Sequence, residues 1–260
     1  MGSLVLAITQ IKNWGVGDAR TLLAGLGAIV LVTVVIKRSQ VHPDPVLYLP
    51  LFKDPSYRRG VILNILIAGT FAGTFFSYIR LLIDGWGLST FHAGLAVAVI
   101  PRFGGPLSIV SGRIADKHGP RVVIVPGAVL IAAAGLVLAA QVTKQRNVGG
   151  LFIPIAVLYG IGVGFAHAAC HASALRTVTT ERLGVGGAMS RIGMDVGGVI
   201  TVAVAVAFVS SAKDPVAGVK VVTVLVSVVC LLGAALAMRL PPTLAPTDFV
   251  SRQASPLAEV

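Results

Sequence analysis

Hydrophobic residues of this chain gather into long runs, and short polar segments separate the runs. A helix needs roughly 20 consecutive, mostly apolar residues to cross the hydrocarbon core of a bilayer. Seven runs approach or reach that length, so the pattern predicts an all-α membrane protein with seven transmembrane helices. The predicted spans are 21–36, 61–83, 93–111, 122–141, 150–171, 187–210 and 221–237.

The segments outside these spans differ in character and divide the chain. Residues 1–20 hold the apolar run Leu4–Ile11, which is too short to span and is interpreted as the stub of a truncated helix. It lacks the flanking features of a signal peptide. Residues 21–37 form an extra transmembrane helix, 38–59 a Pro-rich cytoplasmic linker, 60–239 a six-helix unit, and 240–260 a disordered cytoplasmic tail.

Composition supports the membrane interpretation. The 260 residues are 55% hydrophobic and only 12% charged, whereas soluble domains contain about 25% charged residues. A soluble fold of this size has too little interior to bury so much apolar surface. Cys170 and Cys230 both lie in apolar runs, which argues against a disulfide framework and against a thiolate metal site, so no metal is expected.

The net charge of +11 raises the question of nucleic acid as a partner. The sequence has no basic helix and no platform of basic and aromatic residues, so no nucleic-acid partner is expected. Basic residues instead gather in loops, and one side of the predicted membrane holds about twice as many as the other. This bias places the C-terminus in the cytoplasm and residues 1–20 outside. The residues of the richer side are Lys37, Arg38, Lys53, Arg58, Arg59, Arg113, Lys117, Arg121, Arg176, Arg182, Arg239 and Arg252.

One polar segment between two spans, residues 112–121, has a distinctive pattern. We expect a tight loop that makes spans 93–111 and 122–141 antiparallel neighbours. Gly112 would allow close helix approach, and Gly119 would supply an unusual backbone angle. Asp116 would cap the next helix or pair with a nearby arginine. An ordinary basic cytoplasmic turn explains the spacing equally well.

This segment resembles the Gly-x-Leu-Ala-Asp-Arg-x-Gly-Arg-Lys/Arg loop of the major facilitator superfamily. Pro120 departs from that pattern by replacing a basic residue. In that superfamily the loop follows the second helix of a six-helix half. The resemblance implies that the segment controls a cytoplasmic gate. The matching residues, identical or similar in kind, are Gly112, Ile114, Asp116, Lys117, Gly119 and Arg121.

Three further features resemble the C-terminal portion of the fourteen-helix drug:proton antiporters. Span 187–210 is rich in glycine but lacks the Gly-Pro element found in the first half of antiporters. His42-Pro43, followed by apolar residues, resembles the linker before the last six helices. Asn13-Trp14-Gly15 and the lone span after it resemble the extra helices in the middle of that family. Residues 60–239 would then be the second six-helix half of a transporter.

The resemblance implies proton-coupled efflux of small amphipathic or cationic compounds by a multi-pass protein of a bacterial plasma membrane, without a cofactor and not as an enzyme. Its partners would be substrate, protons and the lipid bilayer. Because the first six helices are absent from this sequence, two alternatives stay open: a truncated, inactive fragment, or half of a split transporter that needs a partner chain. A membrane enzyme and a retinal protein have less support, since Gly-x-Ser-x-Gly is absent and Lys220 lies at the edge of the last span.

Ionisable residues at membrane depth are costly and are candidates for function. Arg102 lies in the middle of span 93–111 and would bind an anionic group, or pair with Asp195 or with free carbonyls. Arg191 and Asp195 are four residues apart and share one helix face. They form either an internal ion pair or a site for a proton or a cationic substrate. We place all three near a cavity lined by spans 61–83, 93–111, 150–171 and 187–210.

Two other patterns in the spans have structural explanations as well as functional ones. His167 and His171 lie four residues apart and could bind a metal, but a water-facing, protonatable pair is favoured because the zinc-protease glutamate is missing. Glycine pairs recur at a spacing that suits close helix contacts. These pairs are Gly69/Gly73, Gly160/Gly164 and Gly193/Gly197.

Overall fold

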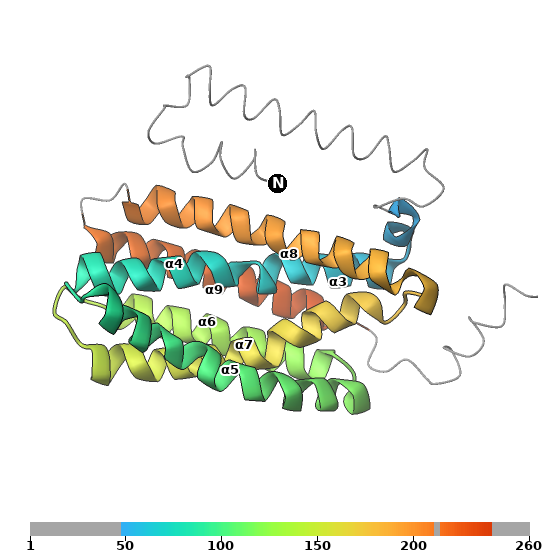
Figure 1. The fold of residues 1–260 in the computed structure, drawn as a ribbon, viewed down its shortest axis with the longest axis horizontal. Helices are drawn as coiled ribbons and strands as arrows, with labels where there is room; N and C mark the ends of the chain where they lie inside the picture. The colour runs from blue at the N-terminus through green and yellow to red at the C-terminus, as the bar shows by residue number, and fades with distance from the viewer. Residues whose placement is uncertain (1–47, 211–213, 241–260) are drawn as a thin grey trace, which may run out of the picture.

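A computed structural model describes residues 48–210 and 214–240 of the chain (Figure 1). The predicted segments 1–20 and 21–37 lie outside the described residues. So do residues 38–47 of the linker 38–59 and nearly all of the tail 240–260.

Within the described ranges, six helical segments are long and apolar enough to cross a membrane, as predicted for the last six spans. Most extend beyond the predicted bounds. The largest extensions carry charged residues such as Arg58 and Lys117 past the apolar run, because helical hydrogen bonding continues into the polar interface. The six segments are Pro55–Gly85, Thr90–His118, Arg121–Gln141, Val148–Leu175, Thr180–Val209 and Pro215–Ala237.

The first segment is built from several helical pieces. After the short 3₁₀ helix η1 (Leu49–Lys53), α3 (Pro55–Leu63) begins where the Asp54 carboxylate accepts a hydrogen bond from the Ser56 N–H. A π-helical turn, η2 (Asn64–Ala68), leads into α4 (Thr70–Arg80), and a second π turn, η3 (Leu81–Gly85), ends the segment. The first long helical segment therefore begins at Pro55, inside the predicted linker 38–59.

The remaining helices follow in simple order along the chain. Helix α5 begins after Ser89, whose hydroxyl caps the His92 N–H, and α6 follows it after two residues. The π turns η4 and η6 adjoin α7 and α8, and the 3₁₀ helix η5 precedes α8. Their bounds are α5 Thr90–His118, α6 Arg121–Gln141, η4 Val148–Phe152, α7 Ile153–Leu175, η5 Thr180–Arg182, α8 Leu183–Ala205, η6 Val206–Ser210 and α9 Pro215–Ala237.

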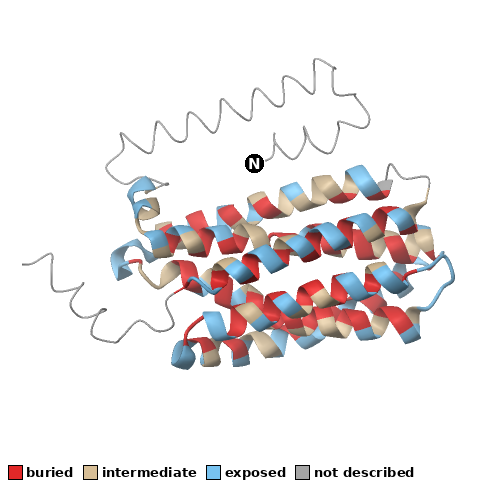
Figure 2. Cartoon of the chain, turned by 180° about the vertical axis from the view of Figure 1, so that it is seen from behind, coloured by how far each residue is buried: buried red, intermediate tan, exposed pale blue. Residues whose placement is uncertain are grey.

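Helix α7 packs against α5, α6, α3 and α8, and α8 lies on the opposite side of the bundle from α5 and α6 (Figure 1). Helix α5 packs mainly on α7, α6 packs on α7 and α9, and α8 packs on α4. Buried residues concentrate between these layers (Figure 2). The segments containing α5 and α8 have the smallest buried share of the six.

Close helix contacts form at the glycines, as the spacing predicted. A Cβ atom built on Gly69 would lie 2.6 Å from the Gly197 Cα, and one on Gly160 would lie 2.7 Å from the Ile100 carbonyl oxygen. The Thr201 hydroxyl donates to the Gly69 carbonyl oxygen at 2.9 Å, which adds a polar contact between α8 and the first segment. Small residues thus bring α4 against α8 and α5 against α7.

Candidate functional site

A cavity of about 420 Å³ opens between the first segment, α7 and α8. Of the predicted lining spans, 61–83, 150–171 and 187–210 contribute to it. Helix α5 contributes no residue to this cavity among those that the structure describes, so the expected lining by span 93–111 stays a prediction. The lining residues are Ala68, Gly69, Phe71, Ala72, His167, Arg191, Met194, Asp195, Gly198, Val199, Val202, Ala203 and Val206.

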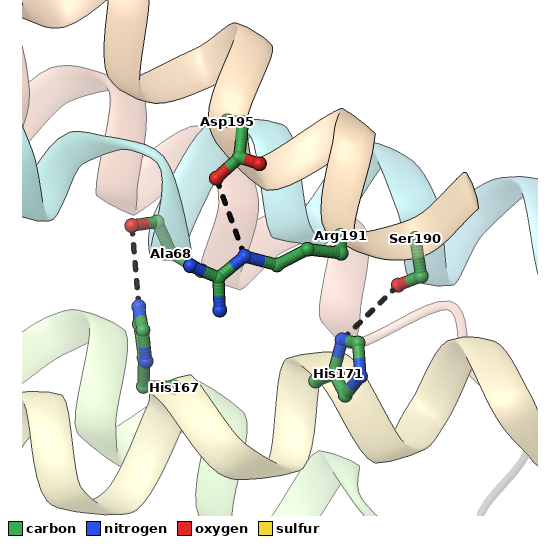
Figure 3. A network of polar contacts seen from close by, with 6 residues as sticks. All are labelled: Ala68, His167, His171, Ser190, Arg191 and Asp195. Atoms are coloured by element: carbon green, nitrogen blue, oxygen red, sulfur yellow. Dashed lines mark hydrogen bonds and ion pairs between the residues drawn. The ribbon is translucent and has the colours of Figure 1, made fainter. Parts of the chain in front are cut away.

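The π turn η2 forms one edge of the cavity. The Gly69 N–H donates to the carbonyl oxygen of Asn64, five residues back, at 2.7 Å. The ring of His167 donates to the neighbouring Ala68 carbonyl oxygen at 3.3 Å (Figure 3). A π turn is an uncommon element that is often found at functional sites. Here the π turn η2 places the Ala68 carbonyl oxygen where His167 of α7 can bind it at the cavity.

The charged part of the lining is one ion pair on α8. Arg191 Nε lies 3.3 Å from Asp195 Oδ1, and the two side chains are 66% and 47% exposed (Figure 3). The predicted ion pair therefore forms, and it forms inside the cavity rather than in a dry core. Its contact is a single one, longer than the roughly 2.7–2.9 Å of a strong charge-assisted hydrogen bond.

The rest of the cavity wall is apolar apart from His167. Phe71 stands next to His167, with ring centroids 5.9 Å apart, and Met194 and Val202 extend the apolar surface along α8. A ligand with a large apolar body and one charged group fits this combination.

A buried polar cluster lies beside the cavity, and the sequence reasoning missed its central residue. Asn64 is fully buried, and its Nδ2 donates to Ser190 Oγ at 2.7 Å and to the Cys170 carbonyl oxygen at 3.4 Å. Ser190 Oγ lies 3.3 Å from His171 Nδ1. His171 is thus held to α8 while His167 is held to the first segment. A lone asparagine in an apolar run was the available signal.

Arg102 lies apart from the other two candidates. Arg102 is exposed on α5 and does not line the cavity. The expected pairing with Asp195 is wrong, because Asp195 pairs with Arg191 on its own helix face. The buried face of α5 is instead the one that carries Gly104, which packs against Gly160.

The motif at residues 112–121 is mostly helix rather than loop. Residues 112–118 form the last two turns of α5, and Gly119 and Pro120 alone connect α5 to α6. Gly119 has the predicted unusual angle, φ 88°. The expectation for Gly112 is wrong, since a Cβ atom there would meet nothing within 4 Å. Helix α5 makes its close contacts at residues nearer its middle.

Asp116 and a residue that the sequence analysis did not single out as a site, Arg176, join two helix ends. Arg176 Nη2 donates to the Ala115 carbonyl oxygen at 2.6 Å and lies 3.9 Å from Asp116 Oδ1. Arg176 follows α7 directly, so the contact holds the C-terminal ends of α5 and α7 together. Lys117 and Arg121 are exposed beside it. The alternative of Asp116 capping the next helix is not the one observed.

The opposite ends of the helices carry two further ion pairs. Arg80 Nε lies 2.7 Å from Asp84 Oδ2, and Lys144 Nζ lies 3.2 Å from Asp214 Oδ2. Desolvation opposes ionisation of Asp214, but hydrogen bonds from Lys144 and from the Val216 N–H outweigh it and hold the pKa of that carboxyl below its usual range. This pair connects the loop after α6 to the start of α9.

Comparison with known proteins shows the family of this chain. The sequence profile of the Major Facilitator Superfamily matches residues 60–259. The chain is 24% identical over 215 residues to the lincomycin resistance protein LmrB of Listeria monocytogenes. It is 28% identical over 207 residues to the tetracenomycin C resistance and export protein of Streptomyces glaucescens, and 25% identical over 199 residues to the drug efflux pump JefA of Mycobacterium tuberculosis.

These matches cover most of this chain but less than half of each relative. They cover 82%, 78% and 76% of the chain, and 45%, 38% and 38% of the three relatives in the same order. The matched part is the C-terminal portion of the relatives, as the resemblance in sequence predicted.

Proposed function

Because the chain belongs to the major facilitator superfamily of membrane transporters, we propose that it supplies the substrate-binding cavity of a pump that exports small amphipathic or cationic compounds in exchange for protons. The single observation that carries this proposal is the cavity itself: an apolar pocket with one carboxylate, Asp195, on a helix long and apolar enough to cross a membrane. The names of the relatives, which include drug efflux and resistance proteins, support the same substrate class.

Asp195 is the residue proposed to bind both the proton and a cationic substrate. An acid at membrane depth is costly and is most often retained for function. Its side chain is half exposed to the cavity, so either a proton or a ligand can reach it. A proton bound at the carboxylate excludes a cationic substrate, and a bound substrate excludes the proton. This competition is the minimum needed to couple substrate export to proton entry.

The contact between Asp116 and Arg176 is proposed to act as a cytoplasmic gate. It joins the ends of α5 and α7, and α7 also carries His167 at the cavity. A movement of α7 on substrate binding would therefore reach this contact directly. Gly119, with its positive φ, fixes where α5 ends, and Lys117 and Arg121 add positive charge beside the contact.

The chain is proposed to act as one half of the transporter. It spans less than half the length of the relatives it matches, and transport by this superfamily moves two halves around a central site. The other half would be supplied from outside these residues, and an inactive fragment is the alternative. The distribution of Lys and Arg supports a cytoplasmic C-terminus. The bacterial origin of the relatives supports a bacterial plasma membrane.

The test is dye efflux and drug susceptibility in a pump-deficient bacterial host. The chain is expressed alone, and then together with a separately encoded six-helix N-terminal half of a relative. Efflux only in the second case, abolished by Asp195→Asn, supports the proposal. An absence of efflux in both, with insertion confirmed, supports the inactive fragment. Efflux from the chain alone contradicts the half-transporter arrangement.

A further inference from the structure

The cavity contains a positive group of its own beside the carboxylate that is proposed to bind cations. Arg191 and Asp195 occupy the same face of α8, and both line the cavity. Among the described residues that line it, Asp195 is the only acid. A cationic ligand that enters the cavity therefore meets an Asp195 carboxylate that is already paired with Arg191.

The geometry of this pair favours exchange over permanent pairing. The guanidinium uses only Nε, at 3.3 Å, although a bidentate contact would involve two nitrogens. The basic residue precedes the acid by four positions, which is the less favourable order for a helical ion pair. Both side chains are largely exposed, and exposed pairs of this kind contribute little to stability.

The surroundings offer a cation more than the carboxylate alone. The Phe71 ring lines the same cavity, and aromatic faces attract cations that have left water. Apolar residues of α8 such as Val199 and Val202 accommodate a hydrophobic body. A lipophilic cation can thus replace the guanidinium at Asp195 and gain apolar contacts that the arginine does not make.

We infer that Arg191 is a resident competitor at Asp195, which a cationic substrate must displace in order to bind. Arg191 then sets a threshold for entry: cations with a large apolar body displace it, and small hydrophilic cations do not. The inference rests on the proposed function, because it requires that cations bind at Asp195, and it assigns to Arg191 a role in specificity.

The test measures binding of tetraphenylphosphonium to the full chain in lipid nanodiscs, with empty nanodiscs as background. Tetraphenylborate, which has a similar shape and the opposite charge, is the matched probe. Removing the competitor by Arg191→Gln or Arg191→Met should tighten tetraphenylphosphonium binding by up to about fivefold. Arg191→Lys keeps the charge and should stay near the parent affinity. Arg102→Gln removes an arginine at membrane depth outside the cavity and should change nothing.

The outcomes separate the inference from the function on which it rests. If Asp195→Asn abolishes tetraphenylphosphonium binding but neither uncharged variant of Arg191 tightens it, the competitor role is wrong and the cation site stands. If Asp195→Asn leaves binding unchanged, both are wrong. If tetraphenylborate binds more tightly than tetraphenylphosphonium and loses affinity in Arg191→Gln, Arg191 is an anion receptor and the inference is overturned.

Discussion

Gly73 provides a quantitative test of the packing between α4 and α8. A Cβ atom added at Gly73 would lie 2.5 Å from both the carbonyl carbon and the carbonyl oxygen of Thr201. Ordinary contacts of a Cβ atom begin near 3.4 Å, so Gly73→Ala creates an overlap of almost an ångström against backbone. Backbone cannot rotate away, and the two helices must separate.

The expected cost follows from two opposing effects. Overpacking a tight contact typically costs about 1–3 kcal/mol. Alanine in place of glycine inside a helix recovers about 0.5–1 kcal/mol. Gly73→Ala should therefore lose up to about 2.5 kcal/mol of stability, with a middle value near 1 kcal/mol, and lower the melting temperature by a few degrees. Gly94→Ala on α5 is the matched control: its Cβ meets nothing within 4 Å, so it should melt at or above the parent.

The chain itself provides a convenient assay for unfolding. Its two cysteines, Cys170 and Cys230, are both fully buried. A fluorogenic maleimide should therefore react only as the bundle unfolds, and its fluorescence on heating gives the melting temperature of purified protein in detergent. If Gly73→Ala melts at or above Gly94→Ala, the close contact between α4 and α8 does not exist and the packing described above is wrong.

Two further predictions concern polar contacts. Asp116→Asn should reduce dye efflux in the two-chain assay by up to about fivefold while insertion and melting temperature stay near the parent, because a pair at 3.9 Å with an exposed carboxylate contributes at most about 1 kcal/mol. Full efflux in this variant would exclude the gate. The Asp214→Asn variant should lose less stability at low pH than the parent does. Folding lowers the pKa of Asp214, so its ionised carboxylate stabilises the folded state above the unfolded-state pKa near 4. This stabilisation is lost as the pH falls through the lower pKa of the folded state. The parent should therefore lose more melting temperature than the variant between about pH 5 and pH 2, measured by circular dichroism. The amide oxygen of the introduced asparagine can still accept the capping hydrogen bond from the Val216 N–H; equal losses would show that the pair with Lys144 has no effect on stability.

Sequence reasoning predicted the helices and the glycine contacts because both depend on local patterns. Long apolar runs specify spans whatever packs beside them. The spacing of Gly69 and Gly73 places both on one helix face, so a neighbour can approach there. Arg191 and Asp195 paired as expected because residues four apart on one helix are neighbours in any fold.

Several of the errors involved residues far apart in sequence. Whether Arg102 faces the cavity depends on how α5 rotates about its axis, and the packing of Gly104 on Gly160 fixes that rotation. Arg176 contacts Ala115 across 61 positions, and nothing in its own segment indicates this partner. Asn64 gave a local signal, but its partners Ser190 and Cys170 lie on other helices.

The π turn η2 has a consequence for which sequence changes the first segment can accept. In an α-helix each residue turns the chain by about 100°, and a π turn holds one residue more than the α-helical turn it replaces. The turn therefore absorbs one extra residue and leaves the faces of α3 and α4 in nearly the same phase. Deleting one residue within Asn64–Ala68 would restore regular winding while Phe71 stays at the cavity wall and Gly73 still meets Thr201. An aligned relative with a single gap at this point can thus keep the same contact between α4 and α8, whereas a gap elsewhere in the segment would turn one helix against the other by about 100°.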